Sequence, residues 1–273
     1  ELKMPAPRGV ILDRRGQVLA DNRPAFDIVV IPQYIVNPSK MLATLEQLLG
    51  IPREELRTSW SHRHDQAPYQ PLVIFPDAPL DKVSLIRGRQ LPWHAEDDAF
   101  DLRGVEVLPR YLRSYPDGEA VTHVVGYVRE VDTKKLEETR EQYPGRYDMG
   151  DLVGIQGVEQ DWDIQLRGFD GFSQRVVDAG GREVHYEGIA DQLEDRQPIG
   201  GSNLYLTIDR DLQMVAKELF AERAGAAVVV DVHTGAIRAF YSAPSYDLNR
   251  LVSPEGSAYW QELATDQAKP LLV

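Results

Sequence analysis

The apolar residues of this chain occur in short runs separated by turn-forming residues, and this pattern limits the elements that the chain can form. Among the longest uninterrupted runs is Ala226 to Val230. A helix that crosses a bilayer needs about 20 consecutive apolar residues, so the pattern excludes a polytopic membrane protein. It predicts short strands and amphipathic helices that pack into an α+β fold.

Composition and charge exclude further classes of function. The 273 residues carry 30 Lys and Arg against 43 Asp and Glu, which gives a formal net charge of −13. This charge argues against nucleic acid as a partner, because a phosphate backbone is bound by a stripe of basic residues. The absence of cysteine excludes disulfides, thiolate metal sites and cysteine nucleophiles. The length predicts about two domains.

Asn, Pro and Gly residues mark the elements of the first half. The clearest helix covers residues 38–49, with Asn37 as its N-cap, Pro38 in its first turn and Gly50 beyond its end. Pro24 and Pro32 are expected to bound a separate strand over 26–31. Further helices are predicted over 53–63, 79–89 and 132–142, and further strands over 10–12, 18–20, 72–75, 105–111 and 123–128.

In the second half, a polar run over 191–197 leads to Gly200-Gly201, and the pattern then changes to a strand, a helix and a hairpin. We take Gly200-Gly201 as the domain boundary. Before it, residues 155–166 predict one amphipathic helix with Trp162 on its apolar side, and residues 172–177 and 183–186 predict a hairpin. After it, Asp209 is expected to cap a helix whose apolar residues share one face. A strand over 204–208, a hairpin of 226–230 with 236–241, and a helix near 260–263 complete the prediction.

Motifs for cofactors and catalysis are absent from the sequence, which has no phosphate loop, dinucleotide fingerprint or nucleophile elbow. His62 and His64 lie two residues apart, so on a helix they point to different sides and favour a solvated helix end over a metal site. Asp161 and Asp163 have the same spacing, which does not suit the facing carboxylates of a glycosidase. We therefore expect no metal and no cofactor.

Other charged residues favour structural roles. His123 is expected to make a structural hydrogen bond, and Arg8, Asp13 and Arg14 to form a local ion-pair set that closes a turn. Two other classes of function stay open. One is a carbohydrate-active hydrolase that uses Asp161 with a distant partner, and the other is a stand-alone periplasmic binding module.

Several short blocks, taken in order, resemble class B penicillin-binding proteins, and most closely the elongation-type branch of that family. The sequence departs from the family pattern at Arg15, where an Asn is usual, and at Leu248, where a Pro is usual. The residues that match the family's structural motifs are Arg8, Gly9, Asp13, Gly16, Arg113, Tyr115, Pro116, Gly118, His123, Gly126, Gly154, Gly157, Glu159, Thr207, Asp209, Asp231, Gly235, Ser245, Tyr246 and Asp247.

The resemblance implies a domain organisation. Residues 1–202 would form an elongated, β-rich pedestal, also called the dimerisation domain. Its head subdomain would cover about 37–149, and its anchor subdomain would come from 1–36 and 150–202. Residues 203–273 would be the first part of a transpeptidase domain, with an incomplete sheet of the serine β-lactamase type.

The acyl-transfer chemistry of the family depends on Ser-x-x-Lys, Ser-x-Asn and Lys-Thr-Gly, and none of these occurs here. We therefore expect the nucleophilic serine to lie beyond Val273 and this chain to be inactive, with no catalytic residue of its own. The first residue is Glu1 rather than Met, which is typical of a processed or excised piece of a longer protein. The resemblance implies an N-terminal membrane helix that these 273 residues do not include.

The function implied by the resemblance is non-catalytic. The pedestal would position and regulate a peptidoglycan-crosslinking transpeptidase in cell-wall elongation and cell-shape maintenance, at the periplasmic face of the bacterial inner membrane. The implied partners are a SEDS-family glycan polymerase (RodA-like) and an MreC-like scaffold protein, with no nucleic acid.

Three surfaces are candidates for contact with other chains. Helix 38–49 and segment 93–100 are the candidate partner surfaces, although the apolar stripe of the helix could instead pack into the core of the head subdomain. The strands over 226–230 and 236–241 would lack neighbours in an incomplete sheet, so we expect either self-association through them or poor order of this region.

Overall fold

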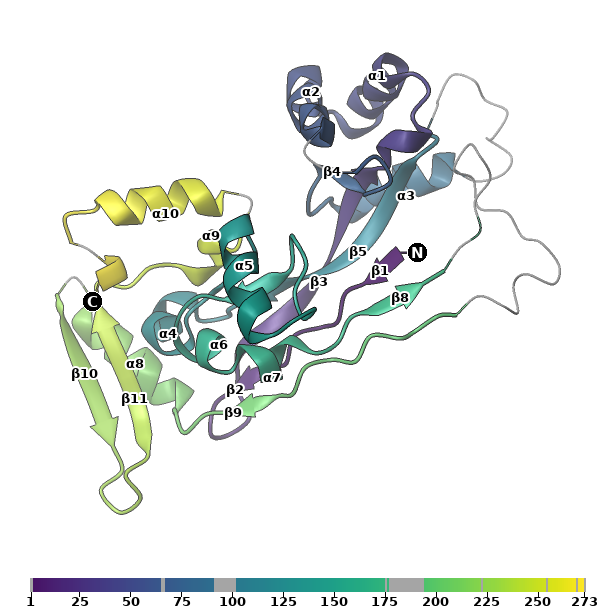
Figure 1. The fold of residues 1–273 in the computed structure, drawn as a ribbon. Coiled ribbons are helices and arrows are strands. Elements are labelled where there is room, and N and C mark those ends of the chain that lie inside the picture. The colour runs from purple at the N-terminus through teal and green to yellow at the C-terminus, as the bar shows by residue number, and fades with distance from the viewer. Residues whose placement is uncertain are drawn as a thin grey trace. The chain divides into compact units, whose positions relative to one another are not determined.

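A computed structural model shows how the chain folds (Figure 1). The structure describes residues 2–64, 67–90, 102–174, 176, 194–221, 223–253, 255–268 and 270–272. Contacts divide the chain into two compact units. The first comprises residues 1–4, 24–110 and 172–197, and the second comprises 5–23, 111–171 and 198–273. Helices and short strands alternate along both units, which confirms the α+β prediction.

The first unit packs three helices against a small sheet. The helices are α1 (Pro38–Leu49), α2 (Arg53–Ser61) and α3 (Leu80–Arg89), and short 3-10 turns cover Pro32–Tyr34 and His62–His64. Strand β3 (Val18–Val30) is antiparallel to β4 (Leu72–Phe75), with Val30 opposite Leu72, and it also pairs with β5 (Val105–Ser114). Strand β1 (Leu2–Met4) pairs with β8 (Gly171–Ser173).

Helix α1 confirms the prediction over residues 38–49. The Asn37 side chain accepts a hydrogen bond from the Lys40 N–H at 3.1 Å, and Gly50 takes the left-handed conformation that ends the helix. The apolar stripe of the helix is buried in the core of the first unit. The stripe therefore belongs to the core and does not form a partner surface. All of segment 93–100, the other candidate surface, lies outside the described residues, as does most of the expected hairpin over 172–186.

The second unit builds its core from segments that are far apart in the sequence. Strand β2 (Ile11–Leu12) lies between β3, which is antiparallel to it, and β9 (Leu204–Tyr205), which is parallel. Strand β6 (Val128–Glu130) pairs with β7 (Leu152–Gly154), and β10 (Gly225–Val230) with β11 (Ile237–Ala243). The helices are α4 (Gly118–Val125), α5 (Thr133–Gln142), α6 (Gly157–Asp161), α7 (Asp163–Arg167), α8 (Arg210–Phe220), α9 (Leu248–Leu251) and α10 (Gly256–Thr265). A 3-10 turn, η5, covers Pro270–Leu272.

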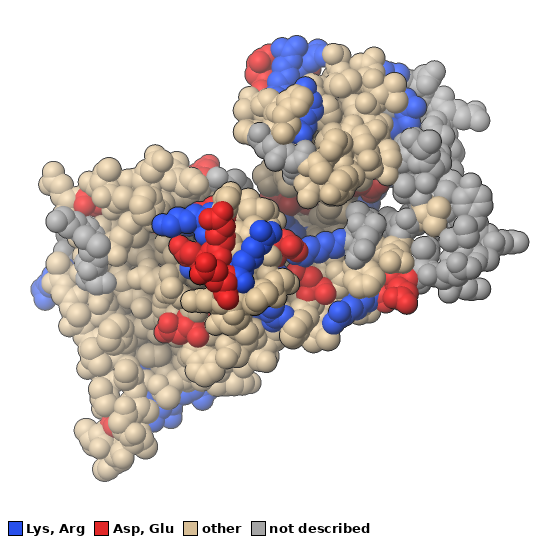
Figure 2. All heavy atoms as spheres, in the orientation of Figure 1, with Lys and Arg blue, Asp and Glu red and all other residues tan. Residues whose placement is uncertain are grey.

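Helix α5 confirms the prediction of a helix over 132–142 with mixed charges. Its N-cap is Asp132, and its Leu136 side chain is buried in a small apolar cluster with Tyr147 and Val153. Acidic and basic side chains lie interspersed on its surface (Figure 2). Such mixed charges keep a surface helix solvated.

The strand predicted over 123–128 is wrong, because α4 covers the first half of this range and only Val128 belongs to a strand, β6. Ala120, Val121 and Val125 recur at helical spacing and are buried together, so tertiary packing outweighs the β preference of the valines. Gly126, with φ 73°, ends the helix.

Three other boundaries also differ from the predictions. Strands 18–20 and 26–31 are one strand, β3, because exposed Pro24 lies between the residues paired with β2 and those paired with β4. The helix predicted over 155–166 is broken into α6 and α7 at Trp162. Trp162 is exposed instead of lying on the apolar side, and Asp163 is buried. The strand over 204–208 shortens to β9, because β2 offers only two residues for pairing.

The expected domain boundary near residue 202 does not coincide with the packing of the chain. Residues 198–273 share the second unit with residues 5–23 and 111–171. The division into 1–202 and 203–273, with head and anchor subdomains, stays a prediction. In the part of the chain that the structure describes, no helix is both long and apolar enough to cross a membrane.

Candidate functional site

The second unit contains a buried ion cluster made of Arg8, Arg113, Glu159 and Asp163. The Glu159 carboxylate is fully buried between two guanidinium groups, with Arg8 Nε at 2.6 Å from one oxygen and Arg113 Nε at 2.7 Å from the other. Arg8 also pairs with Asp163 through its Nη2 at 2.6 Å. The cluster therefore joins β5, α6, α7 and the segment that leads into β2.

The charges of this cluster stabilise one another. Burial alone would lower the pKa of Arg8, but Glu159 and Asp163 outweigh that effect and raise it. Tyr147 donates a hydrogen bond to Asp163, and burial together with this carboxylate raises the pKa of the tyrosine. The Gly154 N–H also donates to Asp163 at 3.0 Å. Both carboxylates are committed to structural contacts, which does not suit them for acid–base work.

Glycines let the backbone segments around the buried ion cluster approach closely. A Cβ on Gly126 would lie 1.8 Å from the Gln156 carbonyl oxygen, and one on Gly157 would lie 2.6 Å from that of Val124. Both residues have positive φ, which side chains rarely adopt. Gly9 and Gly154 face carbonyl oxygens at similarly short distances. Only glycine therefore allows α4 and α6 to meet in this way.

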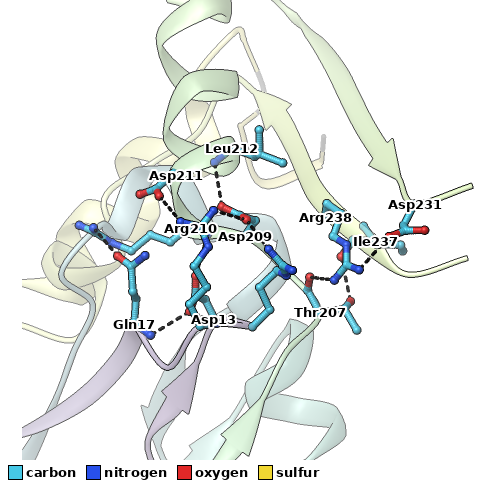
Figure 3. A network of polar contacts seen from close by, with 12 residues as sticks. Asp13, Gln17, Thr207, Asp209, Arg210, Asp211, Leu212, Asp231, Ile237 and Arg238 are labelled. Carbon is cyan, nitrogen blue, oxygen red and sulfur yellow. Dashed lines mark hydrogen bonds and ion pairs between the residues drawn. The ribbon is translucent and has the colours of Figure 1, made fainter. Parts of the chain in front are cut away.

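A second group of charges, the turn cluster, joins the turn after β2 to the start of α8 (Figure 3). It consists of Asp13, Arg14, Arg15, Asp117, Asp209 and Arg210. Asp13 accepts hydrogen bonds from the N–H groups of Arg15 at 2.7 Å, Gln17 at 2.8 Å and Arg210 at 3.1 Å. The Asp13 carboxylate thus closes its own turn, which ends at Gly16 with φ 82°, and also contacts α8.

Asp209 and Arg210 complete the turn cluster. Asp209 caps α8 through the Leu212 N–H, as predicted, and pairs with Arg14 at 3.1 Å and Arg15 at 2.6 Å. The Arg210 guanidinium binds Asp117 through two hydrogen bonds, one of them from Nη2 at 2.7 Å. A bidentate pair of this kind fixes orientation as well as distance.

In the predicted local ion-pair and turn-closing set, only the turn-closing role of Asp13 is correct. The partners of Arg8 are Glu159 and Asp163, and the partner of Arg14 is Asp209, so both arginines bridge distant parts of the chain. Asp13 accepts from its own turn, as a turn-closing residue does.

Acid should weaken the turn cluster. Burial tends to raise the pKa of Asp13 and Asp209, but their hydrogen bonds lower both below the ordinary value. The unfolded chain therefore takes up protons first as the pH falls, so the stabilisation is complete above about pH 4 and is lost below it. We expect the urea midpoint to decline as the pH falls below about 4, and to decline less in Asp209→Asn, which keeps a capping oxygen. Parallel declines in the two proteins would contradict this assignment.

Helix α4 and Tyr115 just before it make a third set of contacts, with α8 and with the segment after β11. The Tyr115 N–H donates to Asn249 Oδ1 at 2.9 Å, and Asn249 Nδ2 returns a hydrogen bond to the Tyr115 carbonyl at 2.8 Å. Thr122 Oγ1 donates to the Tyr246 carbonyl at 2.8 Å, and Gln213 Nε2 to the Ala120 carbonyl at 2.7 Å. These contacts place α4 against α8 and the start of α9.

The remaining motif residues on α4 and α9 lie beside these contacts. A Cβ on Gly118 would lie 2.9 Å from Asp247 Oδ1, and exposed Pro116 precedes the helix. Asp247 caps α9 through the Asn249 N–H at 2.9 Å. His123 Nε2 lies 3.2 Å from the Pro270 carbonyl oxygen, in keeping with a structural role.

The hairpin of β10 and β11 has its own polar turn. The Asp231 carboxylate accepts from Arg238 at 2.9 Å and from two backbone N–H groups, and Arg238 with these donors lowers its pKa to about 2. Gly235, with φ 73°, completes the turn. Thr207 Oγ1 donates to the Ile237 carbonyl at 2.8 Å, and Ser245 Oγ lies 3.3 Å from Tyr241 Oη.

Sequence reasoning missed residues that proved central. The sequence presents Asp163 only as a glycosidase carboxylate, and it gives no direct sign of the contacts that Asp117, Gln213 and Asn249 make. A usable signal was present at Gln213, an amide between the apolar Leu212 and Met214. Such a polar residue, once buried, needs defined partners.

The described residues do not group into a metal or glycosidase site. Among them, no three His, Asp or Glu side chains could hold a metal ion together. Asp161 is exposed, whereas Asp163 is paired with Arg8 and Tyr147. The buried ion cluster, the turn cluster and the α4 contacts together form a site that we call the junction. It joins residues 5–23 and 111–171 to the part of the chain that follows residue 202.

Comparison with known proteins gives consistent matches. The model of the penicillin-binding protein dimerisation domain matches residues 3–206. The peptidoglycan D,D-transpeptidase MrdA of Haemophilus influenzae is 29% identical and matches 99% of this chain and 39% of its own length. MrdA of Escherichia coli K12 is 30% identical over 97% of this chain and 40% of its own length. The chain therefore spans less than half of these curated relatives.

A solved structure supports the same fold. It is the complex between Penicillin-Binding Protein (PBP2) and MreC from Helicobacter pylori, with a TM-score of 0.73 and 24% identity. The match covers 98% of this chain and 47% of the solved chain.

Proposed function

Because the chain belongs to the family of the penicillin-binding protein dimerisation domain, with a pedestal of the PBP2 type, we propose that this pedestal positions and regulates a peptidoglycan-crosslinking transpeptidase domain. In this proposal the domain works in cell-wall elongation and cell-shape maintenance. Residues 1–202 are the non-catalytic part, and residues 203–273 begin the transpeptidase domain. The nucleophilic serine follows later in the longer protein.

The junction is the observation that carries this proposal. Arg210 binds Asp117, Asp13 accepts from the Arg210 N–H, and α4 contacts both α8 and the start of α9. These contacts are oriented and largely shielded from water, so a displacement of residues 5–23 or 111–171 moves the first elements after residue 202 with them. A ligand that prefers one arrangement of the pedestal would thereby shift the population of arrangements of the following domain.

The partners follow from the same proposal. The solved relative is a complex with MreC, which supports an MreC-like scaffold protein as a ligand of this pedestal. A RodA-like SEDS glycan polymerase is the second proposed partner. The full protein would be held at the periplasmic face of the inner membrane by an N-terminal helix. No nucleic acid is proposed, in line with the net charge of −13.

Labelling with a fluorescent penicillin tests the proposed function. This chain lacks Ser-x-x-Lys, so we expect no covalent label on the 273 residues. A longer chain of the same protein that continues past Val273 and includes Ser-x-x-Lys should be labelled in a one-to-one ratio. A label on the shorter chain, or none on the longer one, would refute the proposal.

The two alternatives from the sequence find no support in the site. A hydrolase would need facing carboxylates in reach of substrate, but Asp161 is exposed at the end of α6 and the neighbouring Asp163 is held in ion pairs. A stand-alone binding module would not need the junction to residues 203–272. We therefore propose neither.

We also propose that this chain self-associates through the exposed apolar residues of β10 and β11. Val228 and Val230 are 54% and 48% exposed, and they lie opposite Phe240 and Ile237, which are both 39% exposed. This end of the second unit is largely uncharged in Figure 2. A strand with unsatisfied backbone groups and apolar side chains invites pairing with a second copy.

Sedimentation velocity tests the self-association. The unsubstituted chain should sediment faster as its concentration rises, and Val228→Lys should remove that dependence by placing a charge in the contact. The control is Val73→Lys, which alters an exposed valine on β4 in the first unit and should keep the dependence. Sedimentation as a monomer at every concentration would contradict the proposal.

A further inference from the structure

Helix α4 reaches the last described turn of the chain through His123. The imidazole Nε2 lies 3.2 Å from the carbonyl oxygen of Pro270, in η5. A carbonyl only accepts hydrogen bonds, so this contact requires a proton on Nε2. The ring is partly buried and stands edge-on to Tyr246, with ring centroids 5.7 Å apart and planes at 85°. Its orientation is thus fixed from two sides.

The surroundings favour a neutral donor. Burial lowers the pKa of His123, and the hydrogen bond to Pro270 offsets this effect only in part. Near pH 7 the ring is therefore uncharged, and the tautomer with the proton on Nε2 is the one that fits the contact.

The contact of His123 continues a series along α4. Ala120 accepts from Gln213 on α8, Thr122 donates to the Tyr246 carbonyl just before α9, and His123 contacts Pro270 in η5. Leu271, in the same 3-10 turn, packs against the core that contains Val121 and Val125 of α4. Successive residues of one helix therefore hold successive parts of the chain beyond residue 202.

We propose that His123 is a positioning residue, whose Nε2–H holds the Pro270 carbonyl and so fixes the direction in which the chain leaves η5. The contact stands on its own geometry. Its consequence for acylation rests on the proposed function, in which the nucleophilic serine follows this turn. In that case α4 sets the place of the serine relative to the pedestal.

A matched pair of substitutions separates the hydrogen bond from packing. Gln and Met have side chains of about the same length, but only Gln carries an N–H donor. His123→Met should speed hydrogen exchange in residues 263–272 about fivefold, the effect of one hydrogen bond of ordinary net strength. His123→Gln should restore slow exchange, and α1 in the first unit should be unaffected in both. Equal exchange in the Met and Gln variants would overturn the proposal.

The tautomer provides a measurement on the unsubstituted chain, which cannot be confused with a folding defect. Long-range ¹H–¹⁵N spectra should show the His123 ring with its proton on Nε2 near pH 7. A ring protonated on Nδ1 alone would overturn the proposal, because Nε2 would then face the carbonyl without a proton.

The longer chain that includes Ser-x-x-Lys tests the consequence. The rate constant for acylation by fluorescent penicillin should fall about fivefold in His123→Met and recover in His123→Gln. An unchanged rate beside altered exchange would overturn the role in positioning the serine while leaving the contact intact. A longer chain that binds no penicillin at all would refute the proposed function, and the exchange and tautomer results would still decide the contact.

Discussion

Replacing Glu159 with alanine is expected to lower the free energy of unfolding of this chain by about 3–5 kcal/mol, the cost of removing one partner from a buried charge set. Glu159 is fully buried and is the shared partner of Arg8 and Arg113. Without its carboxylate, two guanidinium groups would remain buried with incomplete pairing. Urea unfolding followed by circular dichroism measures the change.

The matched control for Glu159 is Glu138→Ala. Glu138 pairs with Lys135 at 3.3 Å on the surface of α5. Exposed pairs contribute about 0.2–1 kcal/mol, so this substitution should be nearly silent. Equal losses in the two variants would show that the buried ion cluster does not hold the second unit together.

The second large effect is expected for Gly126→Ala. A Cβ at this position would lie 1.8 Å from the Gln156 carbonyl oxygen, so the backbone of α4 or α6 would have to move. Gly126 also has φ 73° and ψ −159°, a backbone conformation that is essentially restricted to glycine and costs a residue with a side chain on the order of 1–3 kcal/mol by itself. The free energy of unfolding should fall by more than about 3 kcal/mol in total, because the backbone clash adds to the cost of the conformation.

Gly145→Ala is the control for a positive φ without a steric clash. Gly145 has φ 69°, close to that of Gly126, but a Cβ there would meet nothing within 4 Å. This variant should lose only the conformational part, about 1–2 kcal/mol. A Gly126→Ala variant that unfolds at the same urea concentration as Gly145→Ala would contradict the close packing of α4 against α6.

Capping and turn residues predicted element boundaries correctly where neighbouring residues decide the structure. Asn37, Pro38 and Gly50 fixed the limits of α1, and Asp209 was correctly identified as the cap of α8. The turn of Asp231 and Gly235 also matched the hairpin of β10 with β11. In each case the deciding hydrogen bonds join residues fewer than five positions apart.

The failures occurred where distant residues decide the structure. Valines at positions 121, 124 and 125 favour a strand in isolation, but α4 forms because its buried face packs in the core with residues such as Tyr246 and Leu248. The break at Trp162 follows from the pairing of Asp163 with Arg8, which lies more than 150 positions away in the sequence.

The junction shows the same limit. The family resemblance selected Arg8, Arg113 and Glu159 as motif residues without indicating that they form one ion cluster. The spacing of Arg8 and Arg14 near a turn suggested local pairs, and only the fold shows that their partners lie in α6, α7 and at the N-terminus of α8. The sequence around a charged residue does not identify a distant ion-pair partner.

The central claim is that the junction sets the position of the transpeptidase domain, and the Asp117–Arg210 pair is its most accessible test. In a longer chain that includes Ser-x-x-Lys, the rate constant for acylation by fluorescent penicillin should be measured for Asp117→Asn, with Glu138→Gln as the control for loss of a surface carboxylate. We predict that Asp117→Asn slows acylation at least about fivefold at a temperature where both variants stay folded, since one charge-assisted contact is lost. Equal acylation rates in the two variants would contradict the claim.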